Sequence, residues 1–287
     1  MSATAAAQPL PSAPAAPRRV ALRLAQVRAV FGLSLRITLR GKRIWILGFI
    51  ALVPALLPVL HMVLVRLFTH VGRFPPAMDF FKNVVSVLYL HVLLYVLALA
   101  CGLAIVSDEV EDKTLVHLLL RPLPRWAIVV GRWLSTWLVT SVVLVGSLIA
   151  LYALSWAAQQ EFDVGRRALD HFNLTILALD CLVFVFALGA YLALFSCVGA
   201  WLPHGERWGV VFCFGWESLI TYLPARLKWF TLMYHAQTLF PHKVSVNKLF
   251  SVWGEPLPKL TCALILVIVT VVSLALTVWN LKRREIR

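Results

Sequence analysis

Long apolar runs separated by short polar segments dominate the chain. Several runs stay uncharged for about 20 residues, the length with which a helix crosses the roughly 30 Å hydrocarbon layer. The pattern predicts six transmembrane helices, at about residues 44–65, 84–107, 127–158, 174–202, 208–224 and 260–281. Two runs contain an acid, Asp180 in the fourth and Glu217 in the fifth. The expected fold is therefore an all-α integral membrane protein.

Two different segments precede the first predicted span. Residues 1–17 are rich in alanine and proline and lack the apolar bulk of a core, so we expect a disordered cytoplasmic tail. In residues 20–40, apolar positions recur at helical spacing and arginines lie on the opposite side. This predicts an amphipathic interfacial helix along the inner membrane surface, or alternatively a helix packed on a partner domain. Residues 18–287 are expected to form a single transmembrane domain.

The composition agrees with a membrane location and disfavours several kinds of site. Of the 287 residues, 61% are hydrophobic and 14% are charged, and the net charge is +14. The basic residues flank apolar runs, so membrane lipid and not nucleic acid is the expected partner. The five cysteines lie in apolar runs without a CxxC pair or a Cys/His cluster. Neither a disulfide framework nor a metal site is therefore expected.

The basic residues also orient the predicted helices. With a cytoplasmic N-terminus, 17 of the 27 basic residues fall on the inner side. Cytoplasmic segments of membrane proteins carry an excess of Lys and Arg, so this orientation is favoured. Six spans return the chain to its starting side, so both termini are expected to be cytoplasmic and residues 225–259 external. The expected location is the cell inner (plasma) membrane.

A charged stretch separates the second and third predicted spans. From Ser107 to Arg132 it reads SDEVEDKTLVHLLLRPLPRWAIVVGR. Asp108 followed by Glu111 has the form of a capping box, which predicts a short cytoplasmic helix that ends at the two prolines. Alternatively, the charges simply solvate a loop.

The charged stretch resembles the cytoplasmic signature of type-2 ATP-binding cassette (ABC) permeases, the membrane subunits of exporters. The matching positions are Glu109, Glu111, Thr114, Leu115, the run from Leu118 to Leu120, Arg121, Pro122, Arg125 and Gly131. Lys113 stands where the family often has glycine, and Arg132 where it often has lysine. A surface helix before six spans, a proline-containing turn between the fourth and fifth, and an acid in the fifth extend the resemblance to the whole chain.

The resemblance implies that residues 108–126 form a coupling segment that docks on a separate ATP-binding subunit. The residues expected to make this contact are Glu109, Glu111, Thr114, Arg121, Pro122 and Arg125. The chain lacks the GxxxxGK[ST] motif, so it is expected to bind no cofactor, with ATP and Mg²⁺ held by the partner. The implied function is the permease subunit of an ATP-driven exporter, paired with a second permease in a homodimer or heterodimer. No catalytic residue is expected, and the external segment is expected to carry short external or re-entrant helices.

Four polar residues in the predicted spans are further candidates. A charge in mid-membrane is costly, so Glu217 should face the helix bundle, with Asp180, His61 or His91 as companions. These residues either line a substrate path or tie helices together. As an ion site, Glu217 and Asp180 would instead indicate an ion-coupled carrier or channel. An intramembrane enzyme would need an HExxH or serine motif, which is absent, and a structural anchor would leave the charged stretch unexplained.

Overall fold

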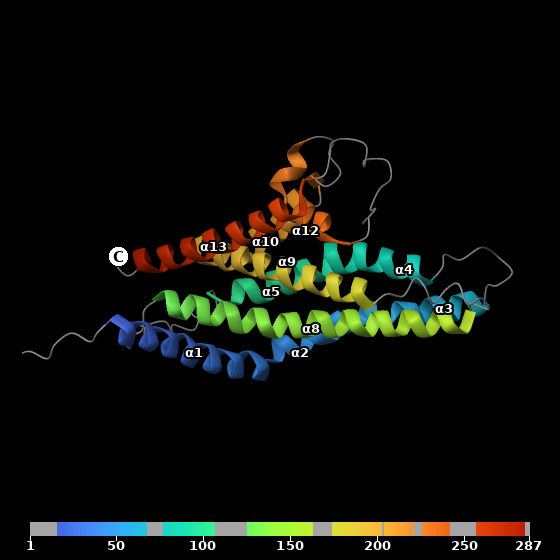
Figure 1. Ribbon diagram of the computed structural model, residues 1–287, viewed down its shortest axis with the longest axis horizontal. Helices are drawn as coiled ribbons and strands as arrows, with labels where there is room; N and C mark the ends of the chain where they lie inside the picture. Colours follow the sequence, from blue (N-terminus) through green and yellow to red (C-terminus); the bar gives the residue numbers. More distant parts are fainter. Residues whose placement is uncertain are drawn as a thin grey trace, which may run out of the picture.

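The protein is an elongated bundle of helices. The computed structural model describes residues 16–67, 77–106, 125–162, 174–202, 204–217, 219–220, 226–241 and 257–284. These residues form helices, and none of them lies in a strand. The long helices run roughly along one axis of the molecule (Figure 1). The all-α expectation is confirmed for the described part of the chain.

Five helical stretches among the described residues are long and apolar enough to cross a membrane. They are Lys42–Leu64, Phe81–Ala104, Arg125–Ala157, Leu174–Trp201 and Lys259–Arg283. These stretches correspond to the first, second, third, fourth and sixth predicted spans. The protein is thus a multi-pass membrane protein.

Proline divides the first span into two helices. α2 (Lys42–Ala55) has Leu56 as its C-cap residue, and α3 (Leu57–Leu67) continues the span. Pro54 lies inside α2. Its ring clashes with the preceding turn and it has no N–H to donate, so a helix interior is interrupted there.

The second span changes its winding along its length. α4 (Ala77–Val84) leads into the π-helix η1 (Val85–Leu93), which α5 (Leu94–Ala104) follows. π-Helices are rare and occur mostly as single turns, frequently at functional sites. A π-helix of nine residues is therefore an unusual feature of this span.

The third and fourth spans are continuous helices. α8 (Arg125–Phe162) has 38 residues, so at 1.5 Å per residue it is about 57 Å long. It exceeds the hydrocarbon thickness, as the long uncharged run predicted. α9 (Leu174–Trp201) packs beside α8, and the Trp137 indole on α8 donates to the Val185 carbonyl on α9 at 2.8 Å.

Two contiguous helical segments cover the first part of the region in which a helix is expected over residues 208–224. α10 (Gly205–Val210) leads into a second π-helix, η3 (Val211–Glu217). Farther along, the 3₁₀-helix η4 (Arg226–Phe230) precedes α12 (Leu232–Leu239). Each piece is too short to cross a membrane alone. The helix expected over residues 208–224 is therefore described in part, as α10 and η3, and a crossing of the membrane there stays a prediction.

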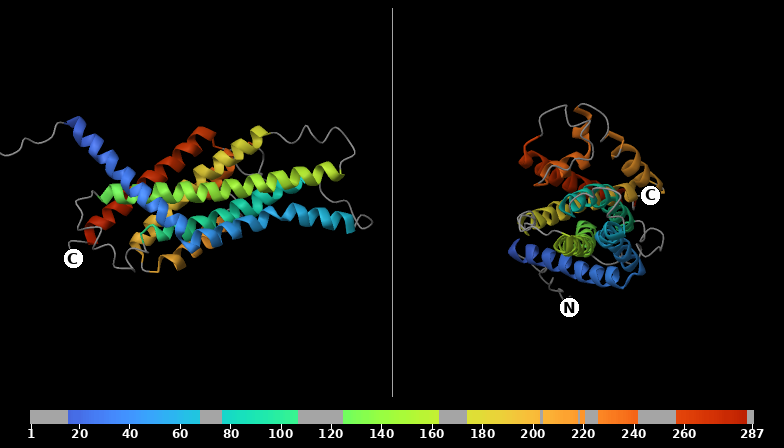
Figure 2. Two further views of the ribbon diagram at one scale, coloured as in Figure 1. Left: turned by 90° about the horizontal axis from the view of Figure 1, so that it is seen from below. Right: turned by 90° about the vertical axis from the view of Figure 1, so that its right-hand side faces the viewer.

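The remaining helices flank this central group. α13 (Lys259–Arg284) packs along α9, and α1 (Ala16–Arg40) packs along α8. Seen end-on, the order from one side to the other is α1, α8, α9 and α13 (Figure 2). The outward faces of α2 and α13 are apolar and exposed, for example at Phe49 and Val271, as a lipid-facing surface requires.

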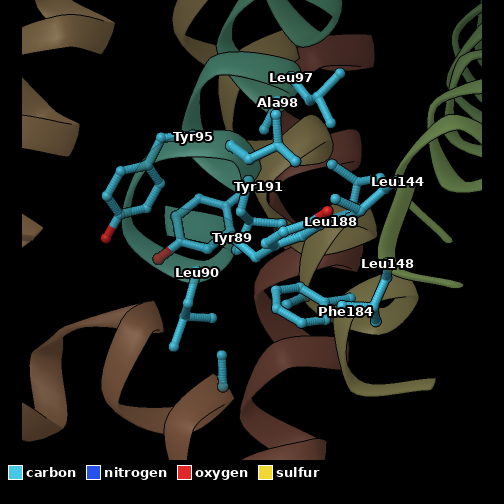
Figure 3. Packing of buried hydrophobic residues seen from close by; sticks show 14 of the residues in the cluster. Tyr89, Leu90, Tyr95, Leu97, Ala98, Leu144, Leu148, Phe184, Leu188 and Tyr191 are labelled. Atoms are coloured by element: carbon cyan, nitrogen blue, oxygen red, sulfur yellow. The ribbon is translucent and has the colours of Figure 1, made fainter. Parts of the chain in front are cut away.

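A buried cluster of large side chains fills the centre of the bundle. Leu144, Leu148, Phe184 and Leu188 gather around Tyr89 (Figure 3). The Tyr89 hydroxyl lies 2.7 Å from Ser147 Oγ, and that oxygen donates to the Ala51 carbonyl. This polar chain ties η1, α8 and α2 together, so three spans share one hydrogen-bonded junction.

Glycines allow α5, α9 and α10 to approach one another closely. A Cβ on Gly102 of α5 would lie 2.8 Å from the Phe195 Cβ of α9. A Cβ on Gly209 of α10 would overlap the Leu99 side chain of α5. Helix association in membranes relies on such small residues, because lipid tails provide no hydrophobic drive between helices.

Candidate functional site

The charged stretch of the sequence falls mostly outside the described residues. Residues 107–124 are not described, so the expected docking residues Glu109, Glu111, Thr114, Arg121 and Pro122 lie outside the described part of the chain. Arg125 is the first residue of α8 and is half-buried. The structure therefore describes the helices on either side of the expected coupling segment, α5 and α8.

A single arginine joins these two ends. Arg132 Nη1 on α8 donates to the Ile105 carbonyl, which caps the end of α5, at 2.8 Å. The last carbonyls of a helix have no partner within the helix, and a cation there also compensates the helix dipole. Arg132 thus fixes the C-terminal end of α5 to the first turns of α8. The sequence pointed only to the charge of Arg132, whereas the structure gives it a specific acceptor.

The signature glycine places α1 against α8 in the same region. A Cβ on Gly131 would lie 3.0 Å from Cγ1 of Val30 on α1, tighter than most packed contacts. One turn farther along α8, Ser135 Oγ donates to Ser34 Oγ of α1 at 2.7 Å. The left view of Figure 2 shows α1 crossing α8 at an angle. Residues 20–40 are thus helical as expected, while their position on a membrane surface stays a prediction.

Glu217 is a fully buried acid at the last position of η3. Its Oε1 accepts from the Leu232 N–H at 3.0 Å, and its Oε2 accepts from the Met233 N–H at 3.0 Å. These are the first two amides of α12, which have no partner within that helix. Thr231 caps the third, since its Oγ1 accepts from the Tyr234 N–H at 3.3 Å. The carboxylate therefore serves as a second cap of α12, where negative charge is favoured by the helix dipole.

Main-chain amides of α12 are thus partners of Glu217 that the sequence did not indicate. Of the three expected companions, His91 also reaches α12, but through Gln237, with the two Nε2 atoms 3.4 Å apart. Asp180 is fully buried in α9, and His61 is half-buried in α3. Roles for these two residues stay predictions. The sequence could not indicate this capping role, because Glu217 and the first residue of α12, Leu232, are 15 residues apart along the chain.

Two tyrosines surround Glu217 with aromatic surface and hydroxyl groups. Both Tyr95 of α5 and Tyr191 of α9 interact electrostatically with the Glu217 carboxyl. Their rings meet edge-to-face with centroids 5.4 Å apart, and Tyr95 also contacts Phe214 of η3. Figure 3 shows both tyrosines beside the central apolar cluster. The end of η3 is therefore embedded between α5 and α9.

His235 on α12 is a buried polar residue that the sequence reading did not single out. Its Nε2 lies 2.9 Å from the Trp229 carbonyl of η4, and the side chain is 2% exposed. A signal was present in the sequence, because the His235-Ala236-Gln237 triplet interrupts an apolar stretch. Histidine alone does not imply a metal here. No group of three metal-ligating side chains occurs among the described residues.

Two arrangements are thus on the described part of the chain: Arg132 links the ends of α5 and α8, and Glu217 caps α12. Comparison with curated proteins finds no match. The family model described as ABC-2 family transporter protein matches residues 28–286, which include the charged stretch, Arg132, Glu217 and all of α12. The chain therefore belongs to the ABC-2 family of transporter proteins, as the membrane-embedded permease component of an ABC transporter.

Proposed function

We propose that this chain is the permease subunit of an ATP-driven exporter that works with a separate ATP-binding subunit at the cytoplasmic surface. The observation that carries the proposal is the family match across the charged stretch between the second and third spans. The hydrogen bond from Arg132 to Ile105 supports it, because it links the two helices from which the coupling segment emerges. A force applied to that segment would therefore be transmitted to α5 and α8 together.

The proposed topology has six crossings with both chain ends inside. α2 and α3 run toward one end of the long axis, and α13 runs back toward the opposite end, where α1 begins (Figure 1). An even number of crossings agrees with this arrangement. The proposed fifth crossing consists of α10, η3 and the residues after them. The distribution of 17 basic residues inside and ten outside supports the same orientation.

The proposed working unit contains two permeases and two ATP-binding subunits. The exposed apolar faces of α2 and α13 provide surface for lipid and for a second permease copy. Charged side chains on the coupling segment suit a polar contact that is broken and remade in every cycle. ATP and Mg²⁺ belong to the partner in this proposal.

Charge reversal in the coupling segment tests the proposal. Glu111→Arg and Arg125→Glu should each weaken retention of the ATP-binding subunit at least tenfold, since losing a paired interfacial charge costs about 2 to 5 kcal/mol. Glu206→Arg is the matched control, because Glu206 is exposed on α10 and lies outside the signature. The measurement is co-purification in lipid nanodiscs, followed by permease-stimulated ATP hydrolysis.

Two outcomes would count against this function. Retention and stimulation equal to the wild-type values in both reversed variants would remove the coupling role. Transport that persists without any ATP-binding subunit would favour the ion-coupled carrier, for which the buried acids Glu217 and Asp180 are the observation.

A further inference from the structure

A cluster of basic side chains lies where α1 ends and α2 begins (Figure 1). Its members, called the basic cluster below, are Arg36, Arg40, Lys42 and Arg43. All four side chains are exposed. Gly41 in their midst is extended, with φ −66° and ψ 131°, so the helix is interrupted there. Four positive charges therefore lie within eight residues on the outside of the molecule.

The helices around the basic cluster offer no acid close to it. The first acid of the chain is Asp79, so α1, α2 and α3 contain none. α1 packs against α8 and α2, and the one acid in α8 is Glu161, at the opposite end from Gly131. Lys42 and Arg43 also occupy the first turn of α2, where the helix dipole disfavours cations. The basic cluster is therefore suited to an anion from outside these helices.

The packing of α1 directs two of these cations away from the bundle. Ser34 of α1 is buried, and its hydroxyl accepts from Ser135 of α8. At about 100° per residue, Arg36 lies about 160° and Arg40 about 120° around α1 from Ser34. Arg36 and Arg40 are four residues apart, so they are neighbours on one face. Two guanidinium groups thus lie side by side on the outward face of α1, an arrangement that suits phosphate oxygens.

Apolar side chains next to the basic cluster indicate what supplies the phosphate. The exposed ones are Leu33, Ile37 and Leu39 of α1 and Trp45 and Phe49 of α2. Cations beside apolar surface are typical of the boundary between headgroups and acyl chains, and tryptophan is enriched there. A phospholipid offers a phosphate to the cations and acyl chains to the apolar side chains. Because the choline headgroup cancels its own phosphate charge, four cations favour a lipid with a net negative charge.

We propose that Arg36, Arg40 and Lys42 bind the headgroup of an anionic phospholipid in the inner leaflet. The lipid supplies the counter-charge that the neighbouring helices do not, and it stabilises the position of α1 across α8. That position matters because α1 contacts Gly131 and Ser135, on either side of Arg132. The inference rests on the proposed function for the inner-side orientation of α1, where the leaflet itself is anionic.

Thermal stability in lipids of different charge tests the site. The full chain is reconstituted without an ATP-binding subunit in nanodiscs of phosphatidylcholine, alone or with increasing fractions of phosphatidylglycerol. Phosphatidylglycerol should raise the Tm of the wild-type chain, and inorganic phosphate added to phosphatidylcholine nanodiscs should not. Each basic residue near an anionic surface contributes about fivefold in affinity, so Arg36→Gln/Arg40→Gln should weaken the binding about 30-fold. The rise in Tm should then disappear, and native mass spectrometry should detect no retained phosphatidylglycerol.

Two matched variants control for charge and for folding. Arg207→Gln/Lys282→Gln removes the same number of charges from exposed positions on α10 and α13, and it should keep the wild-type rise in Tm. Arg36→Lys/Arg40→Lys keeps the charges and should retain most of the rise. In phosphatidylcholine alone, every variant should have the wild-type Tm, because the substituted side chains are exposed. That Tm reports whether each variant is folded.

Four results would overturn the inference. A wild-type Tm that is the same in both lipid compositions would show that the headgroup charge is not recognised. A rise that survives in Arg36→Gln/Arg40→Gln would place the recognition elsewhere, and an equal loss in Arg207→Gln/Lys282→Gln would assign it to net charge. Weaker retention of the ATP-binding subunit by Arg36→Gln/Arg40→Gln in phosphatidylcholine, with an unchanged lipid response, would assign the basic cluster to that partner. The lipid assay contains no ATP-binding subunit, so failure of the proposed coupling would leave its result unchanged.

Discussion

Removing the Glu217 carboxylate should loosen α12 before it affects the rest of the bundle. In Glu217→Ala, the Leu232 and Met233 amides lose their acceptors while the site stays buried. A buried donor left without its acceptor costs about 1 to 3 kcal/mol, so two such amides cost about 2 to 6 kcal/mol. Relief from burying a carboxylate offsets part of this loss. We expect a net loss of about 2 to 4 kcal/mol, or a Tm lower by about 4 to 16 °C.

The variant Glu217→Gln separates the contributions of the two hydrogen bonds to this loss of stability. Glu217→Gln keeps one carbonyl oxygen as acceptor, but its NH₂ group faces the second amide, so about half of the loss should remain. Glu206→Ala is the control, because Glu206 is exposed in the first turn of α10. The measurement is thermal unfolding in nanodiscs together with hydrogen exchange of a peptide that spans α12. Exchange should accelerate in Glu217→Ala and stay at the wild-type rate in Glu206→Ala.

Two results would contradict the capping role of Glu217. If Glu217→Ala and Glu206→Ala have the same Tm and the same exchange rate in α12, the carboxylate does not cap that helix. A lower Tm without faster exchange in α12 would show that the loss arises elsewhere in the bundle. Either result would refute the capping argument.

Two further predictions concern packing and topology. Gly102→Ala should lower the Tm strongly because its Cβ would lie 2.8 Å from the Phe195 Cβ and 3.1 Å from the Leu192 carbonyl oxygen, whereas Gly146→Ala on α8, with nothing within 4 Å, should leave Tm unchanged or raised; equal effects would contradict the close approach of α5 and α9. In a cysteine-free version, an impermeant maleimide applied to intact cells should label Lys248→Cys and spare Asp112→Cys, and labelling of Asp112→Cys alone would invert the topology.

The hydrophobic pattern was enough to predict most of the spans. Five of the six predicted runs correspond to helices that are long and apolar enough to cross a membrane. This success has a local cause, since a helix satisfies its own backbone groups and the bilayer selects for a run of apolar side chains. The charged stretch before Arg132 was likewise sufficient to indicate the family, because its residue types follow one another directly in the chain.

The fifth apolar run contains a feature that hydropathy alone does not predict. Residues 208–224 are as apolar as a regular span, yet the helix changes its winding from α to π at Val211. Within η3, the side chain of Glu217 contacts α12. Hydropathy does not encode such a contact, because it depends on a partner 15 residues farther along the chain.

The sequence by itself determined a multi-pass helical membrane protein with a charged segment between its second and third spans, and it marked Glu217, Asp180, His61 and His91 as the polar residues to explain. Tertiary structure alone decided that Glu217 caps α12, that His91 meets Gln237, and that Arg132 holds Ile105. The physical reason is the range of the interactions. Apolar length acts through the bilayer on each helix separately, whereas a buried hydrogen bond forms only when packing brings its donor and acceptor to within about 3 Å.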